Sequence, residues 1–269
     1  MSTLTVTESL IRKVPYRFKV LKNYSYEPLI NFMLQKKYEK YHTQIEQLKN
    51  KHKGERCFLI GTGPSLNKTD FSKIQDEILF GVNRLYEGFN RFKISCKYMG
   101  IGDEQLFDDI YKKFLSVDAD LFITGYAGRH FFDDEKRYQR FIKNKAIVIK
   151  EQGKIVDGYD TNIVNGIYSG ATIIVDCLQI AMYMGFDEVY LLGCDCDYSG
   201  VHQFHGGKNK HVERDEKVNA YVSSMEPVYQ MFAAYEKIKK TFEKNNQKVY
   251  NATVGGKLEV FERRSLAEI

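Results

Sequence analysis

Short apolar runs alternate with amphipathic stretches along most of this chain. The first run begins at Arg56 and Cys57 and ends in a glycine-rich turn, and six later runs have the length and apolar character of buried strands. The later runs cover residues 77–83, 96–102, 119–124, 146–150, 189–193 and 248–251. Apolar strands separated by helices predict an α/β fold with a mostly parallel, doubly wound sheet that helices flank on both faces.

The helices are predicted from apolar residues that recur at spacings of three and four. Residues 27–51 show this pattern with lysines between the apolar positions. Residues 169–184 are apolar on almost every side, which predicts a buried helix with Ser169 as its N-cap and Gly185 just past its end. A long charged helix is expected over residues 213–245.

Composition excludes several classes of protein. The chain has 269 residues, 43% of them hydrophobic and 28% charged, which suits one large α/β domain with a helical addition. A net charge of +5 is too mild for a dedicated nucleic-acid binder, so we expect no nucleic-acid partner. No apolar run reaches the ~18 residues of a membrane span. Five cysteines without a framework spacing favour a reducing cytoplasm.

We expect two parts: an N-terminal arm and helix over residues 1–54, and a nucleotide-binding α/β domain over residues 55–269. Basic and aromatic residues in segment 1–26 would allow peripheral contact with the inner face of a membrane. A solvated arm is the simpler interpretation of the same composition. The apolar and tyrosine-rich helices also leave room for a homo-oligomer.

A glycine-rich turn ends the first strand, with the sequence Gly61-Thr62-Gly63-Pro64-Ser65. Its glycines let the main chain approach a ligand closely, and its serine can cap the next helix while backbone amides point at a phosphate. The third glycine of the dinucleotide fingerprint and the lysine of a Walker loop are both missing. A strand-to-helix turn also needs glycine for purely steric reasons, so the turn alone leaves both interpretations open.

Polar or small residues follow several other strands. Ligands of parallel sheets bind beyond the carboxyl ends of the strands, so these positions are expected to line one crevice together with the glycine-rich turn. They are Asn83, Asp103, Ser169 with Gly170 at the start of the buried helix, and the run from Asp195 to His205.

The run that follows residues 189–193 is the densest polar segment in the chain, and it allows two kinds of metal site. Four of its side chains are of the zinc-ligand type, although Cys-x-Cys is a less usual zinc spacing than Cys-x-x-Cys. These are Cys194, Cys196, His202 and His205. Asp195 and Asp197 form an Asp-x-Asp pair, which would suit a divalent ion held against a diphosphate.

The same run also suits acid–base chemistry without a metal. Histidine has an ordinary pKa of about 6.5, so His202, His205 or His211 would be able to take a proton from an acceptor hydroxyl at neutral pH. Tyr198 would donate a hydrogen bond to a leaving phosphate. A surface loop with inactive histidines is the plain alternative, although three of the chain's six histidines fall in this short segment.

The order of these motifs resembles that of the bacterial metal-independent sialyltransferases that use CMP-sialic acid. It equally resembles their relatives, the flagellin nonulosonate transferases (motility accessory factors) and the proteins with a 6-hydroxymethylpterin diphosphokinase MptE-like domain. The resemblance covers about residues 55–262 and implies a Rossmann-like, GT-A-variant sheet. It is carried by Gly61 to Leu66, Val82-Asn83-Arg84 with Tyr86, Tyr168 to Ala171, Gly185 to Asp195, and Asn251 to Phe261.

The resemblance also implies roles for individual residues. In the sialyltransferases a Gly-Asn-Gly-Pro-Ser loop, an asparagine after the second strand and a Ser-Gly helix start hold CMP. The matching positions here are Gly61, Thr62, Gly63, Pro64, Ser65, Asn83, Arg84, Ser169 and Gly170, with Asp103 facing the ribose or sugar. Thr62 stands where the family has asparagine. Arg84 or Arg129 would pair with the carboxylate of a nonulosonate donor.

The implied reaction is an inverting, metal-independent transfer of a sialic acid-like sugar from a CMP-activated donor to a cell-surface glycan or glycolipid. It needs no cofactor. The implied catalytic residues are His205, His202 or His211 as base, Tyr198 at the leaving phosphate, and Asp195 beside them. Two alternatives stay open: an ATP-dependent pterin diphosphokinase with a divalent metal on the Asp-x-Asp pair, and a non-catalytic nucleotide-binding module of a glycan-assembly complex.

Overall fold

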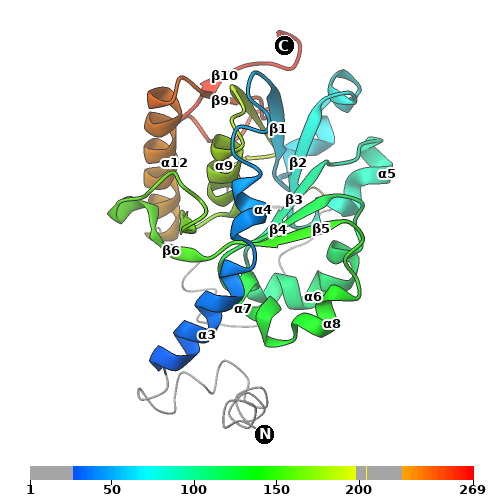
Figure 1. Cartoon of the computed structure of the whole chain (residues 1–269). Helices are drawn as coiled ribbons and strands as arrows, with labels where there is room; N and C mark the ends of the chain where they lie inside the picture. The colour runs from blue at the N-terminus through cyan, green and yellow to red at the C-terminus, as the bar shows by residue number, and fades with distance from the viewer. Residues whose placement is uncertain (1–26, 198–203, 205–225) are drawn as a thin grey trace, which may run out of the picture.

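An eight-stranded, fully parallel sheet forms the centre of the computed structural model, which describes residues 27–197, 204 and 226–269 (Figure 1). The strand order is β10-β9-β8-β1-β2-β3-β4-β5. The strands are β1 (Arg56–Ile60), β2 (Ile78–Val82), β3 (Tyr98–Ile101), β4 (Asp120–Ile123), β5 (Lys145–Val148), β8 (Glu188–Leu192), β9 (Lys248–Asn251) and β10 (Glu262–Arg263). The predicted parallel, doubly wound α/β sheet is confirmed.

Helices lie on both sides of the sheet (Figure 1). They are α3 (Glu27–Glu39), α4 (His42–Glu46), α5 (Phe89–Phe92), α6 (Glu104–Leu115), α7 (Gly125–Asp133), α8 (Glu135–Gln139), α9 (Ile173–Tyr183) and α12 (Glu226–Lys244), with short 3-10 turns η1 (Pro64–Lys68), η2 (Phe71–Ile74), η3 (Asn83–Gly88) and η4 (Ile155–Asp157). The first part of the helix predicted over residues 213–245 falls outside the described residues. None of the helices in the described ranges combines the length and the apolar character that crossing a bilayer requires.

The chain reverses its direction of travel across the sheet next to β1. It builds β1 to β5 toward one edge and then returns to place β8 on the other side of β1. Ile60 and Leu192 are register partners, so β1 and β8 end side by side. Carboxyl ends that adjoin such a switch point are where open parallel sheets bind ligands.

Helix α9 is buried from Ile174 to Tyr183, as its apolar sequence predicts, but it begins later than predicted. Thr172 is its N-cap and its side chain accepts from the amide of Ile174. Ser169, the predicted cap, is instead the last residue of β7 (Ile167–Ser169), which pairs with β6 (Glu151–Lys154) in a small second sheet. The prediction of Ser169 as the N-cap is therefore wrong, because this serine belongs to a strand and Thr172, three residues later, caps the helix.

The predicted helix over residues 27–51 is two helices followed by turns. After α4 the chain turns toward the end of α9, where the amides of Asn50 and His52 donate to the carbonyls of Tyr183 and Met184 at 3.0 and 2.8 Å. These bonds satisfy carbonyls that the end of a helix leaves unpaired. The tertiary contact therefore ends the helical pattern before residue 51.

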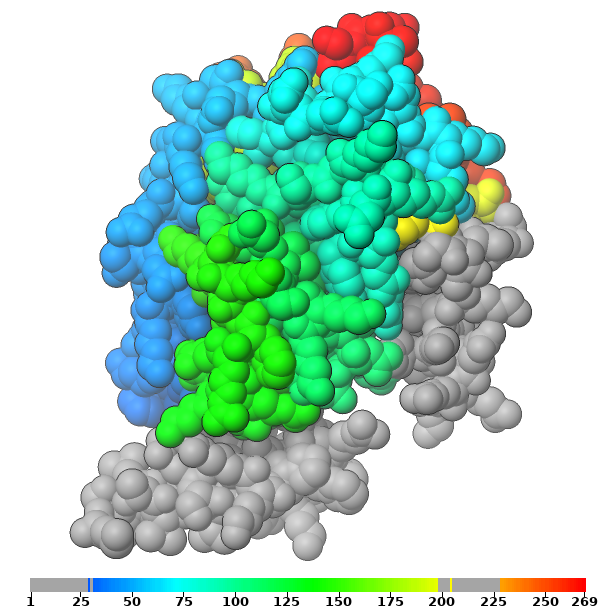
Figure 2. Space-filling model, turned by 90° about the vertical axis from the view of Figure 1, so that its right-hand side faces the viewer, coloured from blue at the N-terminus to red at the C-terminus, as the bar shows by residue number. Residues whose placement is uncertain are grey.

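The N-terminal helices pack directly on the α/β body. The ring of Tyr38 meets Phe132 of α7 edge-on at 4.9 Å, and Lys37 donates to the Phe132 carbonyl at 2.7 Å. Figure 2 shows these helices, in blue, lying alongside the green segment that contains α7 and α8. Tyr38, Ile45 and Leu48 belong to the same buried cluster as the strands.

Candidate functional site

The turns after β1 and β8 interlock at the switch point. The amides of Gly61 and Gly63 donate to the carbonyls of Leu192 and Gly193 at 2.8 and 2.9 Å. The carboxylate of Asp195 then accepts twice from Ser65, from its amide at 3.1 Å and from its hydroxyl at 2.7 Å. Residues 61–65 and 192–195 thus form one hydrogen-bonded surface at the carboxyl ends of adjacent strands, which we call the floor.

Glycine is needed in this floor because the two turns touch. A Cβ on Gly63 would lie 1.8 Å from Asp195 Oδ2, and one on Gly61 would lie 2.5 Å from the Gly193 carbonyl oxygen. Neither distance is compatible with a side chain. The steric interpretation of the glycine-rich turn is therefore correct for these two positions, and any contact they make with a donor remains a prediction.

Ser65 does not cap the next helix as predicted. It lies inside η1, which Gly63 precedes as N-cap, and it is 5% exposed. Its amide and its hydroxyl are both engaged by Asp195. A carboxylate from the same chain therefore stands where the sequence suggested that this amide would meet a phosphate, while Pro64 and Thr62 beside it are half-buried.

A third segment, after β9, holds the β8 turn from the other side. Thr253 accepts from the amide of Cys194 at 3.2 Å, and the amide of Lys257 donates to the carbonyl of Asp195 at 2.7 Å. Arg263 fixes this segment by donating to the carbonyls of Thr253 and Gly255. The shape of the floor thus depends on residues near the C-terminus.

Asn83, at this edge of the sheet, has a side chain with an unsatisfied polar atom within the described ranges. It follows β2 directly with a left-handed φ of 52°, a conformation that asparagine tolerates better than most residues. Its side-chain oxygen is buried and has no hydrogen-bond partner within the described ranges. Unsatisfied buried polar atoms are rare in native proteins, and a bound ligand is one way to satisfy them.

Residue 204 is fastened to the glycine-rich turn. The amide of Phe204 donates to the carbonyl of Thr62 at 2.8 Å, and Asn67 donates to the carbonyl of Phe204 at 3.0 Å. The Phe204 ring is 4% exposed and packs near Phe92. This contact places Phe204 beside the glycine-rich turn.

Four predicted catalytic residues lie outside the described residues. They are Tyr198, His202, His205 and His211. Their proposed roles as hydrogen-bond donor and general base stay predictions.

Other predicted binding residues have structural partners. Asp103 is exposed and caps α6, accepting from the amide of Leu106 at 2.6 Å. Arg84 pairs with Glu87 at 3.1 Å and with Asp109 at 3.8 Å, which compensates its charge. Gly170 gives close approach to α9, because a Cβ there would lie 2.5 Å from Val175.

The residues of the described ranges do not form a metal-binding site. No group of three or more potential ligands occurs among them. Cys194 is buried, and burial raises the pKa of its thiol well above the ordinary value, which disfavours the thiolate that zinc requires. Asp197 pairs with Lys257 at 3.0 Å, while Asp195 accepts from Ser65. Cys196, the other cysteine of the run, has a pKa raised to about 12 by burial.

A buried acid at the ends of β3 and β4 escaped the sequence analysis. Asp176 lies in the first turn of α9, is 7% exposed, and accepts from the Thr124 hydroxyl at 2.7 Å. Burial, with a smaller contribution from the nearby Glu151, raises its pKa to about 7, although the hydrogen bond from Thr124 lowers it. Gly102 leaves room for the pair, since its Cβ would lie 3.4 Å from Asp176 Oδ2. One acid inside an otherwise apolar helix was the available signal.

Solved structures with a similar fold include two sialyltransferase structures. The sialyltransferase CstII from Campylobacter jejuni with the substrate analogue CMP-3FNeuAc has a TM-score of 0.52 at 16% identity, over 80% of this chain and 88% of that one. A single-residue variant of the sialyltransferase CST-II in complex with CMP has a TM-score of 0.52 at 18% identity, with the same coverage. These likenesses show the fold.

The remaining comparisons give one larger glycosyltransferase structure and one family. The MAf glycosyltransferase from Magnetospirillum magneticum AMB-1 matches over 85% of this chain at 14% identity with a TM-score of 0.49, and this chain spans only 39% of that protein. A comparison with curated proteins gives no match. The sequence model of one family, by contrast, matches residues 31–201, well over half of the chain. The chain belongs to the 6-hydroxymethylpterin diphosphokinase MptE-like family.

Proposed function

We propose that this protein is an inverting glycosyltransferase that transfers a sialic acid-like sugar from a CMP-activated donor to a glycan or glycolipid. The observation that carries the proposal is the buried, unsatisfied amide oxygen of Asn83 at the carboxyl end of β2, next to the switch point. The amide oxygen is an acceptor and needs a hydrogen-bond donor. A fully ionised phosphate has no donor, whereas a ribose hydroxyl or the cytosine amino group supplies one. The nucleoside would therefore lie over β2.

The fold supports the same class of donor. Two solved sialyltransferase structures with this fold were determined with CMP or a CMP-sugar analogue. In our proposal the nucleotide lies along the floor formed by the β1 and β8 turns, and its phosphate faces the N-terminal turn of α9. Backbone amides at a helix start suit a monophosphate leaving group.

The proposed reaction is a single in-line displacement. One of the three histidines, His202, His205 or His211, takes the proton of the acceptor hydroxyl. That oxygen forms a bond to the anomeric carbon as the bond from this carbon to the CMP phosphate oxygen breaks, and Tyr198 donates to the departing phosphate. The reaction inverts the anomeric centre.

The family match favours one second candidate, an ATP-dependent diphosphotransferase acting on a pterin. That reaction requires a divalent ion against the phosphates. Asp195 and Asp197 would be its ligands, and both would first have to leave their partners, Ser65 and Lys257.

Thermal-shift measurements with CMP, CDP, UDP, GDP and ATP, each with and without Mg²⁺, separate the two candidates. The transferase predicts that CMP raises the melting temperature without Mg²⁺. The diphosphotransferase predicts a rise with ATP and Mg²⁺ and no response to CMP, and that result would overturn our proposal. A response to none of the five nucleotides would contradict both candidates.

Replacing Asn83 with glycine tests the proposed contact. Glycine accepts the left-handed φ, so the variant removes the amide oxygen while the backbone stays unstrained. We expect CMP affinity to fall by about tenfold, the value of one buried hydrogen bond, with an unchanged melting temperature in the absence of ligand.

Asn246→Gly is the matched control for this variant. It exchanges another left-handed asparagine, φ 57°, for glycine just beyond the end of α12, at the opposite end of the strands from the site. Its CMP affinity should equal that of the unmodified protein. Equal CMP affinity in Asn83→Gly would remove the main support for the proposed nucleotide position.

A further inference from the structure

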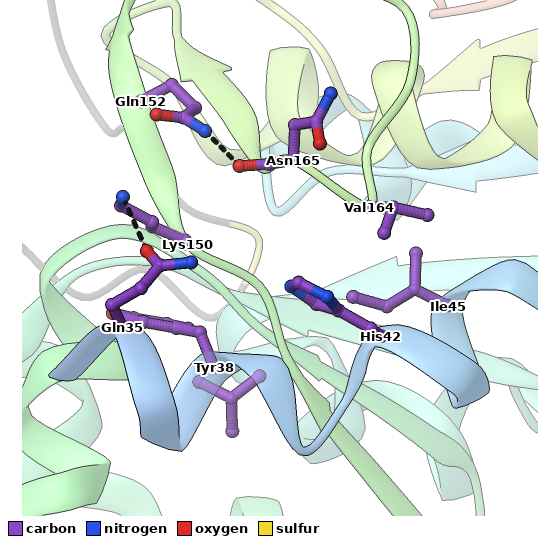
Figure 3. Close-up of a pocket in the computed structure, with 9 residues that line it drawn as sticks. Gln35, Tyr38, His42, Ile45, Lys150, Gln152, Val164 and Asn165 are labelled. Atoms are coloured by element: carbon purple, nitrogen blue, oxygen red, sulfur yellow. Dashed lines mark hydrogen bonds between the residues drawn. The ribbon is translucent and has the colours of Figure 1, made fainter. Parts of the chain in front are cut away.

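A small cavity with polar and apolar side chains in its lining lies between the N-terminal helices and the connection from β5 to β6 (Figure 3). Its volume is about 150 Å³, which is the size that holds a benzene-sized molecule in an engineered protein cavity. A nucleotide is far larger, and none of the residues that line this cavity belongs to the proposed donor site. Its lining comes from α3, α4, the end of β5, β6 and the segment just before β7.

The polar lining is rich in hydrogen-bond donors. Lys150 carries three donor hydrogens, and its hydrogen bond among the described residues goes to the neutral oxygen of Gln35 at 2.9 Å. The amide of Gln152 has two donor hydrogens and donates to the carbonyl of Asn165. None of the described residues that line the cavity carries a carboxylate. A half-buried ammonium among neutral groups favours an anionic ligand.

The acid between two of the lining residues faces elsewhere. Lys150 and Gln152 both line the cavity. Glu151 lies between them and points toward Gly125, whose Cβ would be 3.1 Å from Glu151 Oε2. The carboxylate of Glu151 is thus not among the groups that line the cavity.

The apolar side chains of the lining indicate the chemistry of the rest of the ligand. Ile45, Val148 and Val164 are the apolar side chains of the lining, and Figure 3 shows Ile45 and Val164 facing each other, with His42 beside them. A bare inorganic ion would leave these apolar side chains uncovered. A ligand with an anionic head and a few carbon atoms would cover both kinds of surface.

We propose that this cavity binds a small organic anion, with its carboxylate or phosphate head on Lys150 and Gln152 and its short apolar part against Ile45, Val148 and Val164. The ligand bridges the N-terminal helices and the small second sheet, two parts of the chain that meet here. Its binding would hold α3 and α4 in place. The inference does not depend on the proposed transferase activity.

NMR of the methyl groups in the full-length protein tests the proposal with two probes, isobutyrate for the carboxylate head and methyl phosphate for the phosphate head. We expect at least one probe to shift the methyl signals of Ile45, Val148 and Val164 saturably at millimolar concentration. The probe that binds more tightly identifies the head group. No saturable shift with either probe would overturn the proposal.

Charge variants separate binding in the cavity from a general salt effect. Lys150→Met should weaken the binding of the better probe about tenfold, as expected for the loss of a charge-assisted hydrogen bond, and Lys150→Arg should restore part of it. Lys145→Met removes a lysine from the opposite end of β5 and should leave the affinity unchanged. Equal affinity in Lys150→Met, in a sample whose unliganded spectrum shows the native fold, would rule out the proposed contact.

Discussion

Replacing Asp176 with asparagine is expected to raise the free energy of unfolding at pH 8 by about 2–4 kcal/mol. Burial raises the pKa of this acid from 3.8 to about 7, so the folded protein at pH 8 must hold a desolvated carboxylate. Asparagine has the same shape and no charge. Its amide can donate to Thr124, as a protonated Asp176 would, while the Thr124 hydroxyl keeps its bond to the carbonyl of Ile101.

The pH dependence of this effect has a definite sign. A carboxyl whose pKa is raised by folding binds its proton more tightly in the folded state, so stability is highest below the unfolded pKa and falls as the pH rises toward the folded pKa. For Asp176 the fall spans pH of about 4 to about 7. The advantage of the asparagine variant should therefore be small at pH 4 and reach its full size above pH 7.

Urea unfolding of both proteins between pH 4 and pH 8 measures this difference. Asp76→Asn, which changes an exposed acid at the opposite end of the sheet, should follow the unmodified protein throughout. If Asp176→Asn were no more stable than the unmodified protein at pH 8, neighbouring groups in the fold would already compensate the buried charge of Asp176. Proteins retain costly buried acids most often at functional sites, so the variant also shows whether donor binding needs this charge.

The sheet could be predicted from the sequence because its central strands are buried on both faces. In β1 and β8 four of the five residues are buried, which appears in the sequence as an uninterrupted apolar run. β6 has the sequence Glu-Gln-Gly-Lys and β7 has three residues, so neither shows such a run. The missed second sheet is also why the start of α9 was placed at Ser169 and not at Ile173.

The candidate site could be located from the sequence, but the partners of its residues could not. The rule for carboxyl ends of strands correctly brings the turn of Gly61 to Ser65 next to Asp195. The hydrogen bond from the Ser65 amide to the Asp195 carboxylate depends on the register of β1 and β8, which are far apart in sequence. The unsatisfied oxygen of Asn83 likewise reflects packing in three dimensions, which a linear pattern does not contain.

Replacing Gly63 with alanine is expected to destabilise the protein by about 2–4 kcal/mol and to weaken CMP binding at least tenfold under the proposed function. The φ of Gly63 is −66°, so alanine causes no backbone strain. Its methyl group, however, would occupy the position of the Asp195 carboxylate, 1.8 Å from Oδ2, and would also press on the Gly193 carbonyl at 2.6 Å. Asp195 must then release Ser65, which separates the two turns.

Two companion variants show whether the interlock of the turns is the cause. Gly153→Ala adds the same methyl group where no atom lies within 4 Å, and it should be neutral or stabilise by up to about 1 kcal/mol. Ser65→Ala removes only the hydroxyl bond to Asp195 and should cost about 1 kcal/mol while the amide bond persists. Urea unfolding and CMP titration of all three variants test this order. A Gly63→Ala protein as stable as Gly153→Ala would show that the turns can separate at no cost. The proposed donor site would then not depend on the interlock of the two turns.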